Sequence, residues 1–79
     1  MTIAEAAREV LRREKRPMTV DEIYDGIVSA GLADFKATQP QGVLRNQIRR
    51  HCKDVPHSAS SSDKYFKQTA AKTYFLIDD

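Results

Sequence analysis

The middle of the chain carries side chains suited to binding an anionic, hydrogen-bonding partner. Four positive charges fall within nine residues with no acidic residue among them, at Arg45, Arg49, Arg50 and Lys53. Guanidinium and ammonium groups bind phosphate oxygens, and a guanidinium can also make two parallel hydrogen bonds to guanine. Amide side chains such as those of Gln41 and Asn46 can pair with adenine in the same way. The residue types therefore indicate a surface for a nucleic acid.

Residues that could support catalysis or hold a metal ion are few. Cys52 is the single cysteine, and the histidines are His51 and His57. Zinc sites need four ligands, so we expect no metal centre. A cysteine–histidine pair would need a third orienting group, and the chain offers neither a paired-acid site nor a glycine-rich loop. We expect no enzyme, no cofactor and no small-molecule substrate, and we expect Cys52 to be a packed core thiol.

Composition predicts a single small domain over residues 1–79. The chain is 41% hydrophobic and 30% charged, with a net charge of only +2, so the placement of charge matters more than its total. A lone cysteine, no apolar signal run and no segment long enough to span a membrane favour an intracellular, cytoplasmic location. The chain would suit either a complete protein or the N-terminal domain of a larger one.

A first helix is predicted from Thr2 to Glu14. Apolar residues recur at helical spacing, at Ile3, Ala6, Ala7, Val10 and Leu11. Thr2 and Glu5 form a capping-box pattern, in which each side chain bonds the other residue's backbone amide. Pro17 limits the helix because the residue before a proline is disfavoured in the helical conformation.

A second helix is predicted from Val20 to Ala30, and Thr19 with Glu22 repeats the capping-box pattern. One face would carry Val20, Ile23, Tyr24, Ile27 and Val28. Gly31 suits the left-handed position after the helix, and Leu32 would fold back as the apolar contact of that cap. The outer face is acidic, with Asp21, Glu22 and Asp25.

A third helix is predicted from Pro40 to Lys53, with Thr38 or Gln39 as its cap and proline in its first turn. Its inward side chains would be Val43, Leu44, Ile48 and Cys52. His51 would lie at the end of this helix, where the dipole favours a cation. A polar loop over 54–63 follows.

The C-terminal residues predict a β-hairpin with strands over 65–68 and 73–77. Phe66, Tyr74 and Leu76 would share one face, whereas Tyr65 and Phe75 would be exposed on the other. The expected fold is therefore α+β: a winged helix-turn-helix of three helices and a two-stranded wing, with a possible short third strand near 17–19.

In such a fold the third helix enters the major groove with its N-terminal half near the base edges. The base-contact candidates are therefore Gln41, Arg45 and Asn46. The phosphate-contact candidates, on the rest of the helix and the hairpin, are Arg49, Arg50, Lys53, Lys64, Lys67 and Lys72. The alternative for these cations is a merely solvated surface.

Several strings resemble the HARE-HTH family: 3–11 (IAEAAREVL), 16–23 (RPMTVDEI), Gly31-Leu32, and the hairpin residues 65–67 and 73–76. The resemblance implies a winged helix-turn-helix. Members of this family occur in restriction endonucleases, the bacterial RNA polymerase delta subunit and additional-sex-combs-like chromatin proteins, with a proposed role in binding DNA. Here Gln39 separates the threonine and proline that usually open the third helix, and the acidic tail of the delta subunit is missing.

We therefore expect a double-stranded DNA-binding module, with helix 40–53 in the major groove and the wing on the backbone. It would sense modified bases or target a restriction or modification enzyme, with a fused or associated nuclease or polymerase subunit as a further partner. The alternative is a protein-interaction domain that docks on RNA polymerase or another transcription partner. Salt-dependent binding to duplex DNA separates the two.

Overall fold

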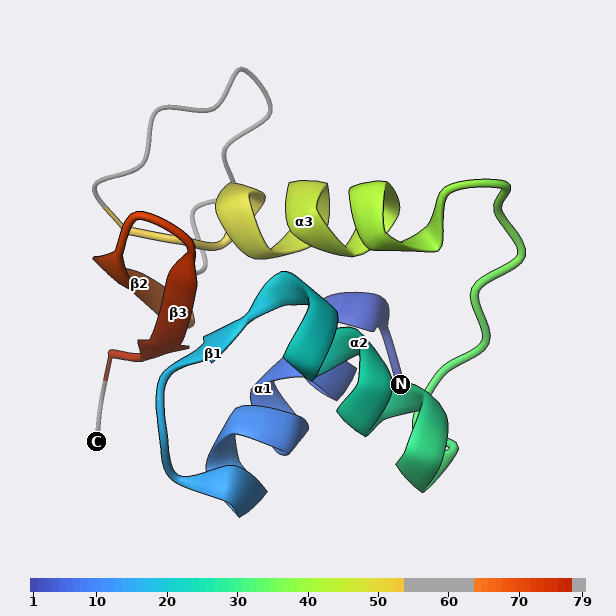
Figure 1. The fold of residues 1–79 in the computed structure, drawn as a ribbon, viewed down its shortest axis with the longest axis horizontal. Coiled ribbons are helices and arrows are strands. Elements are labelled where there is room, and N and C mark those ends of the chain that lie inside the picture. Colours follow the sequence, from blue (N-terminus) through green and yellow to red (C-terminus); the bar gives the residue numbers. More distant parts are fainter. Residues whose placement is uncertain (54–63, 78–79) are drawn as a thin grey trace.

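The computed structural model describes residues 1–53 and 64–77, and Figure 1 shows their arrangement. In chain order, these residues form α1 (Ile3–Glu14), β1 (Met18–Thr19), α2 (Val20–Ala30), α3 (Pro40–Arg50), β2 (Phe66–Ala70) and β3 (Thr73–Leu76). The predicted winged helix-turn-helix is confirmed. The expected loop over 54–63, including His57, lies outside the described residues.

Both predicted capping boxes are present. The Thr2 hydroxyl accepts from the Glu5 amide at 3.1 Å, and the Thr2 amide donates to the Glu5 carboxylate at 2.7 Å. The same pair of bonds joins Thr19 and Glu22, at 3.2 and 2.9 Å. The bond from the Thr19 backbone is the main reason that the pKa of Glu22 is lowered, with Arg16 adding to the effect. The caps fix where α1 and α2 begin, so they set the direction in which each helix leaves the sheet.

The C-terminal ends of these two helices are left-handed turns. Gly31 has φ of 63°, its amide donates to Val28, and the Leu32 amide donates to Ile27 at 3.0 Å. These bonds are the predicted Schellman motif, and Leu32 packs against the core as expected. Helix α1 ends in the same conformation at Lys15, with φ of 56°, although lysine lacks glycine's freedom there.

The sheet has the strand order β1–β3–β2 with antiparallel pairing throughout. The predicted short strand is therefore real: Met18 pairs with Tyr74, which makes β3 the central strand. The hairpin turn is tighter than the expected four residues, because β2 continues to Ala70 through an irregularity after Gln68. Gln68 stabilises this turn by donating to the Ala71 carbonyl at 2.8 Å.

Helix α3 ends at Arg50, so the expected end at Lys53 is wrong. Backbone groups after the helix bond to the hairpin instead: the Tyr65 amide donates to His51 at 2.8 Å, and the Lys53 amide donates to Phe66 at 2.9 Å. The expected side-chain cap at the other end is also wrong. Gln39 occupies that position without a capping hydrogen bond, and Pro40 at the first position leaves one fewer amide to satisfy.

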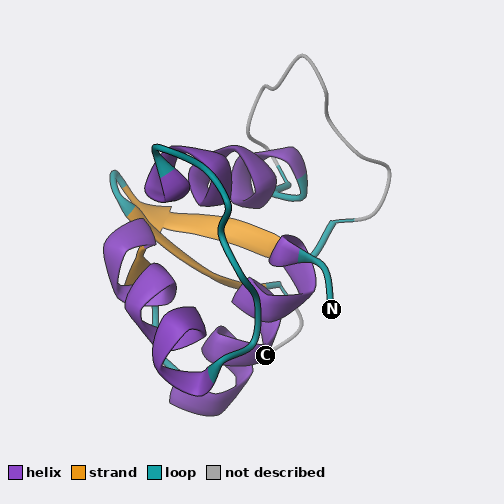
Figure 2. Ribbon diagram, turned by 90° about the vertical axis from the view of Figure 1, so that its right-hand side faces the viewer, coloured by secondary structure: helices purple, strands orange, loops and turns teal. Residues whose placement is uncertain are grey.

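The core lies where the three helices meet the sheet. Fully buried side chains come from every helix and from the hairpin: Leu11, Ile23, Ile27, Leu44, Ile48, Cys52 and Phe66. Figures 1 and 2 show α3 on one side of the fold and the pair α1 and α2 on the other, and Figure 1 shows the hairpin at one end. The expected core thiol is confirmed, since Cys52 is 1% exposed.

Two predictions about burial are wrong. Val28 is 53% exposed, because it lies past the edge of the inward face of α2. Tyr65 and Phe75 are half-buried against the core instead of standing exposed on the outer face of the hairpin. None of the described helices has the length and hydropathy needed to span a bilayer.

Candidate nucleic-acid interface

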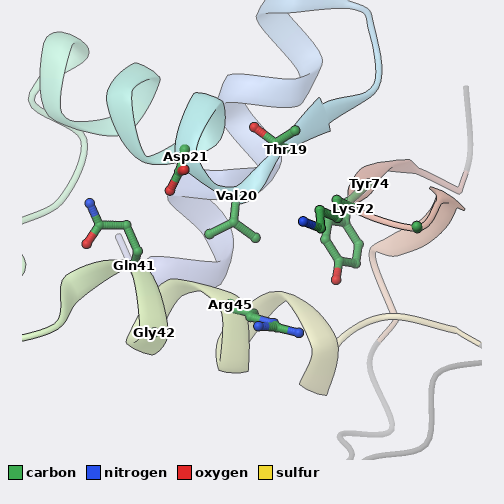
Figure 3. Close-up of a pocket in the computed structure, with 9 residues that line it drawn as sticks. Thr19, Val20, Asp21, Gln41, Gly42, Arg45, Lys72 and Tyr74 are labelled. Atoms are coloured by element: carbon green, nitrogen blue, oxygen red, sulfur yellow. The ribbon is translucent and has the colours of Figure 1, made fainter.

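A groove of about 420 Å³ lies between the start of α2, the first turns of α3 and the hairpin turn (Figure 3). Its lining residues are Thr19, Val20, Asp21, Gln41, Gly42, Arg45, Ala71, Lys72 and Tyr74. Three residues predicted to contact a nucleic acid therefore meet here, namely Gln41, Arg45 and Lys72. They are far apart in the chain, and the antiparallel sheet brings them together because β1, which leads directly into α2, pairs with β3.

The outward face of α3 follows from which of its residues are anchored. Leu44 and Ile48 are fully buried and fix the rotation of the helix. Gln41, Arg45 and Asn46 are consequently exposed. This exposure agrees with their predicted role, although Asn46 does not line the groove.

The predicted phosphate-contact residues divide into separate places. Arg50 and Lys53 are exposed at the far end of α3, where Lys64 also lies, since its ammonium donates to the Arg50 carbonyl at 3.4 Å. Arg49 is half-buried on α3, and Lys67 is half-buried on β2 opposite Phe75. Lys72 is exposed beside the groove. The cations thus follow α3 along its length and continue onto the hairpin.

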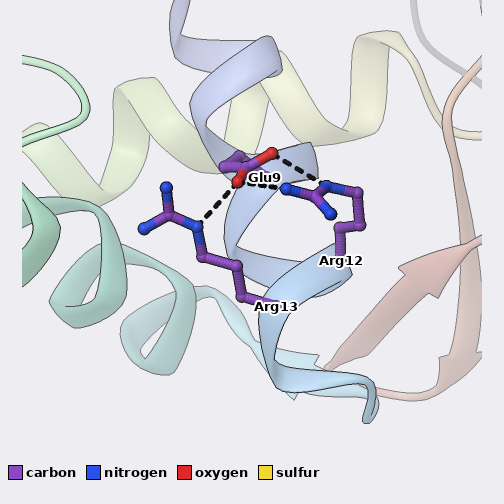
Figure 4. A network of polar contacts seen from close by, with 3 residues as sticks. All are labelled: Glu9, Arg12 and Arg13. Atoms are coloured by element: carbon purple, nitrogen blue, oxygen red, sulfur yellow. Dashed lines mark hydrogen bonds and ion pairs between the residues drawn. The ribbon is translucent and has the colours of Figure 1, made fainter.

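The arginines of α1 are neutralised within the domain. Figure 4 shows Arg12 and Arg13 bonded to one carboxylate, that of Glu9, with the Arg13 contact at 2.7 Å. These two hydrogen bonds lower the pKa of Glu9 to about 2, the bond from Arg12 being the larger cause. Arg16 lies 3.2 Å from Glu22.

The cations of α3 and of the hairpin differ from those of α1. Within residues 1–53 and 64–77, no ion pair involves Arg45, Arg49, Arg50, Lys53, Lys67 or Lys72. A fold with 11 acidic residues leaves these positive charges uncompensated on one helix and its neighbouring turn. Such an arrangement maintains a local positive potential that attracts a polyanion.

An aromatic stack, which was not expected from the sequence, secures the far end of α3. The rings of His51 and Tyr65 stack with centroids 5.0 Å apart, and the Arg8 guanidinium lies 5.1 Å from the centre of the Tyr65 ring. His51 is the C-terminal cap residue, as predicted. The stack ties α1, α3 and the start of β2 together, so it holds the wing against the helix. Only the aromatic character of Tyr65 indicated such a contact.

Asp21 is a second residue that the sequence did not single out for this site. It was grouped with the acidic outer face of the second helix, yet it lines the groove beside Gln41 and Arg45. Among the described residues, no group of three or more histidine, cysteine or acidic side chains could hold a metal ion. The site therefore consists of hydrogen-bonding and charged side chains around a shallow groove.

Comparison with known proteins identifies one family. Residues 1–76 match the family model of the HARE-HTH domain, whose description names the helix-turn-helix domain of ASXL and restriction endonuclease proteins. The match covers all the described elements from α1 to β3. No curated protein and no solved structure matches the chain.

Proposed function

Because the chain belongs to the HARE-HTH family of DNA-binding winged-helix domains, we propose that it binds double-stranded DNA with α3 in the major groove and the hairpin on the backbone. One observation carries this proposal: the cations of α3 and of the hairpin turn are uncompensated among the described residues, whereas those of α1 are paired internally. Phosphates supply the missing negative charge at regular spacing along a duplex.

In this arrangement Gln41, Arg45 and Asn46 are the base readers. All three are exposed in the first two turns of α3, the part of a recognition helix that lies nearest the base edges. Arginine would select guanine, and the two amides would select adenine. Base contacts of this kind carry sequence information, whereas contacts to phosphate do not.

The remaining cations would hold the backbone. Arg49, Arg50 and Lys53 follow the base readers along the chain, and Lys67 and Lys72 extend the surface onto the wing. Lys64 contributes from the far end of α3, where its bond to the Arg50 carbonyl keeps its charge beside the helix. Because α3 ends at Arg50, Lys53 would reach the backbone from the segment after the helix.

The finer role we propose is targeting. A domain of 79 residues that binds DNA without catalytic groups suits the N-terminal module of a larger DNA-acting protein, or the partner of a nuclease or polymerase subunit. Methyl groups on pyrimidines project into the major groove, so the same base readers would distinguish modified from plain DNA. A DNA partner would place the protein inside the cell, at the nucleoid in a bacterium.

Salt dependence tests the proposal against docking on RNA polymerase or another protein. If the domain neutralises about five phosphates, log K for a duplex should fall with log salt with a slope of about −4 to −5. Single-stranded DNA of the same length should give a shallower slope, because its charge density is lower. A flat slope, or no duplex binding at low salt, contradicts the proposed function.

A further inference from the structure

Asp21 is an acidic residue in the middle of a basic surface. It is exposed at the second position of α2, and Figure 3 shows its side chain extending from α2 toward α3, where the Gln41 side chain rises toward it. Arg45 and Lys72 line the same groove, yet no ion pair among the described residues joins either of them to Asp21.

The other acids of α2 have different surroundings. Glu22 completes the capping box and bonds Arg16, so its carboxylate serves the fold. Asp25 is exposed one turn further along the helix and does not line the groove. Asp21 alone among these three places a carboxylate without an ion pair inside the groove.

A carboxylate in this position discriminates between two parts of a duplex. It repels a phosphate, and it accepts hydrogen bonds but donates none. In the major groove the donors are the amino groups of cytosine and adenine, and aspartate accepts from such groups. The apolar parts of Val20 and Tyr74 form adjacent walls of the groove, which limits access by water and strengthens such a bond.

We propose that Asp21 is a specificity-determining residue, which accepts a hydrogen bond from a base amino group and keeps phosphates out of the groove. This inference rests on the proposed DNA-binding function. It assigns Asp21 the role opposite to that of its neighbours: Arg45 and Lys72 raise affinity for every duplex, whereas Asp21 lowers affinity for all duplexes except those with an amino group in reach.

The test compares Asp21→Asn and Asp21→Ala with the matched control Asp25→Asn. Asp25 lies on the same helix and carries the same charge, but it is outside the groove. Each protein is incubated with a pool of randomised duplexes, and the bound fraction is sequenced. Thermal unfolding of each variant confirms that the capping box of Thr19 and Glu22 still supports the fold.

The wild type should favour adenine or cytosine over guanine or thymine at one position of the contacted strand. Asp21→Ala should lose that preference, and both Asp21 variants should bind the average duplex about two- to fivefold more tightly, the range of one screened charge contact. Asp25→Asn should keep the preference and change average affinity less. Preferences that survive in Asp21→Ala, or equal shifts in the Asp21 and Asp25 variants, overturn the inference while leaving DNA binding intact. Failure of the wild type to bind any duplex would overturn the proposed function itself.

Discussion

Gly26 lies where α2 packs against α1, and substitution there gives a prediction with a calculable size. A Cβ added at Gly26 would lie 2.7 Å from Cγ1 of Val10 and 3.2 Å from its Cγ2. Val10 is 3% exposed, and a helical valine has one strongly preferred rotamer, so its methyl groups cannot turn aside. We therefore expect Gly26→Ala to force the two helices apart.

Two opposing effects set the magnitude. Alanine is favoured over glycine inside a helix by about 1 kcal/mol. Overpacking a core contact costs about 1–3 kcal/mol, and contacts this short belong in the upper half of that range. The free energy of unfolding should therefore fall by about 1–2 kcal/mol.

Urea denaturation of four proteins tests this reasoning: the wild type, Gly26→Ala, Val10→Ala and the double variant. With Val10 truncated the clash is removed, so Gly26→Ala should become neutral or stabilising in that background. Gly42→Ala on α3 is the matched control, because its added Cβ would meet nothing closer than 3.9 Å. That substitution should stabilise the domain by about 0.5–1 kcal/mol. Gly26→Ala that stabilises the wild type, or that destabilises both backgrounds equally, would refute the packing argument.

Three further predictions concern the fold. Thr19→Ala removes the hydroxyl that caps α2, so the free energy of unfolding should fall by about 1 kcal/mol in chemical denaturation. Because the pKa of Glu9 is lowered to about 2, its stabilising contribution is fully present above its ordinary value of about 4.5 and is lost as pH falls toward 2; the stability difference between wild type and Glu9→Gln should shrink over that interval, and a difference that grows on acidification would contradict it. Cys52 is 1% exposed, so a thiol reagent should label it only as fast as the domain unfolds; rapid labelling under native conditions would show that the thiol is not packed in the core.

The beginnings and ends of α1 and α2 could be predicted from sequence because their determinants are local. Thr19 and Glu22 lie three residues apart and satisfy each other's backbone without help from the rest of the fold. Gly31 takes the left-handed conformation that its missing Cβ permits. Even the two-residue strand near Met18 was predictable, since the winged-helix order includes a third strand beside the hairpin.

The features that sequence reasoning missed depend on distant partners. Helix α3 stops at Arg50 because the backbone of His51 and Lys53 bonds to residues 65 and 66, and no local signal marks that exchange. The burial of Tyr65 likewise depends on Arg8 and His51 arriving from two other elements.

The candidate site shows the same division. Helical periodicity correctly predicted that Arg45 and Asn46 would be exposed beside a buried Leu44. It could not predict that the hairpin turn would bring Lys72 next to the start of α2, or that Asp21 would line the resulting groove. That juxtaposition arises from the pairing of β1 with β3, which is set by tertiary packing.

The central claim is that the uncompensated cations of α3 and the wing, and not positive charge in general, bind DNA. The most direct measurement compares duplex binding by Arg50→Ala/Lys72→Ala with Arg12→Ala/Arg13→Ala, which removes the same charge from arginines already paired with Glu9. Loss of two phosphate contacts should make the slope of log K against log salt shallower by about 1.8 in the first variant. The second should keep the slope of the wild type. Equal slopes for the two double variants would contradict the claim.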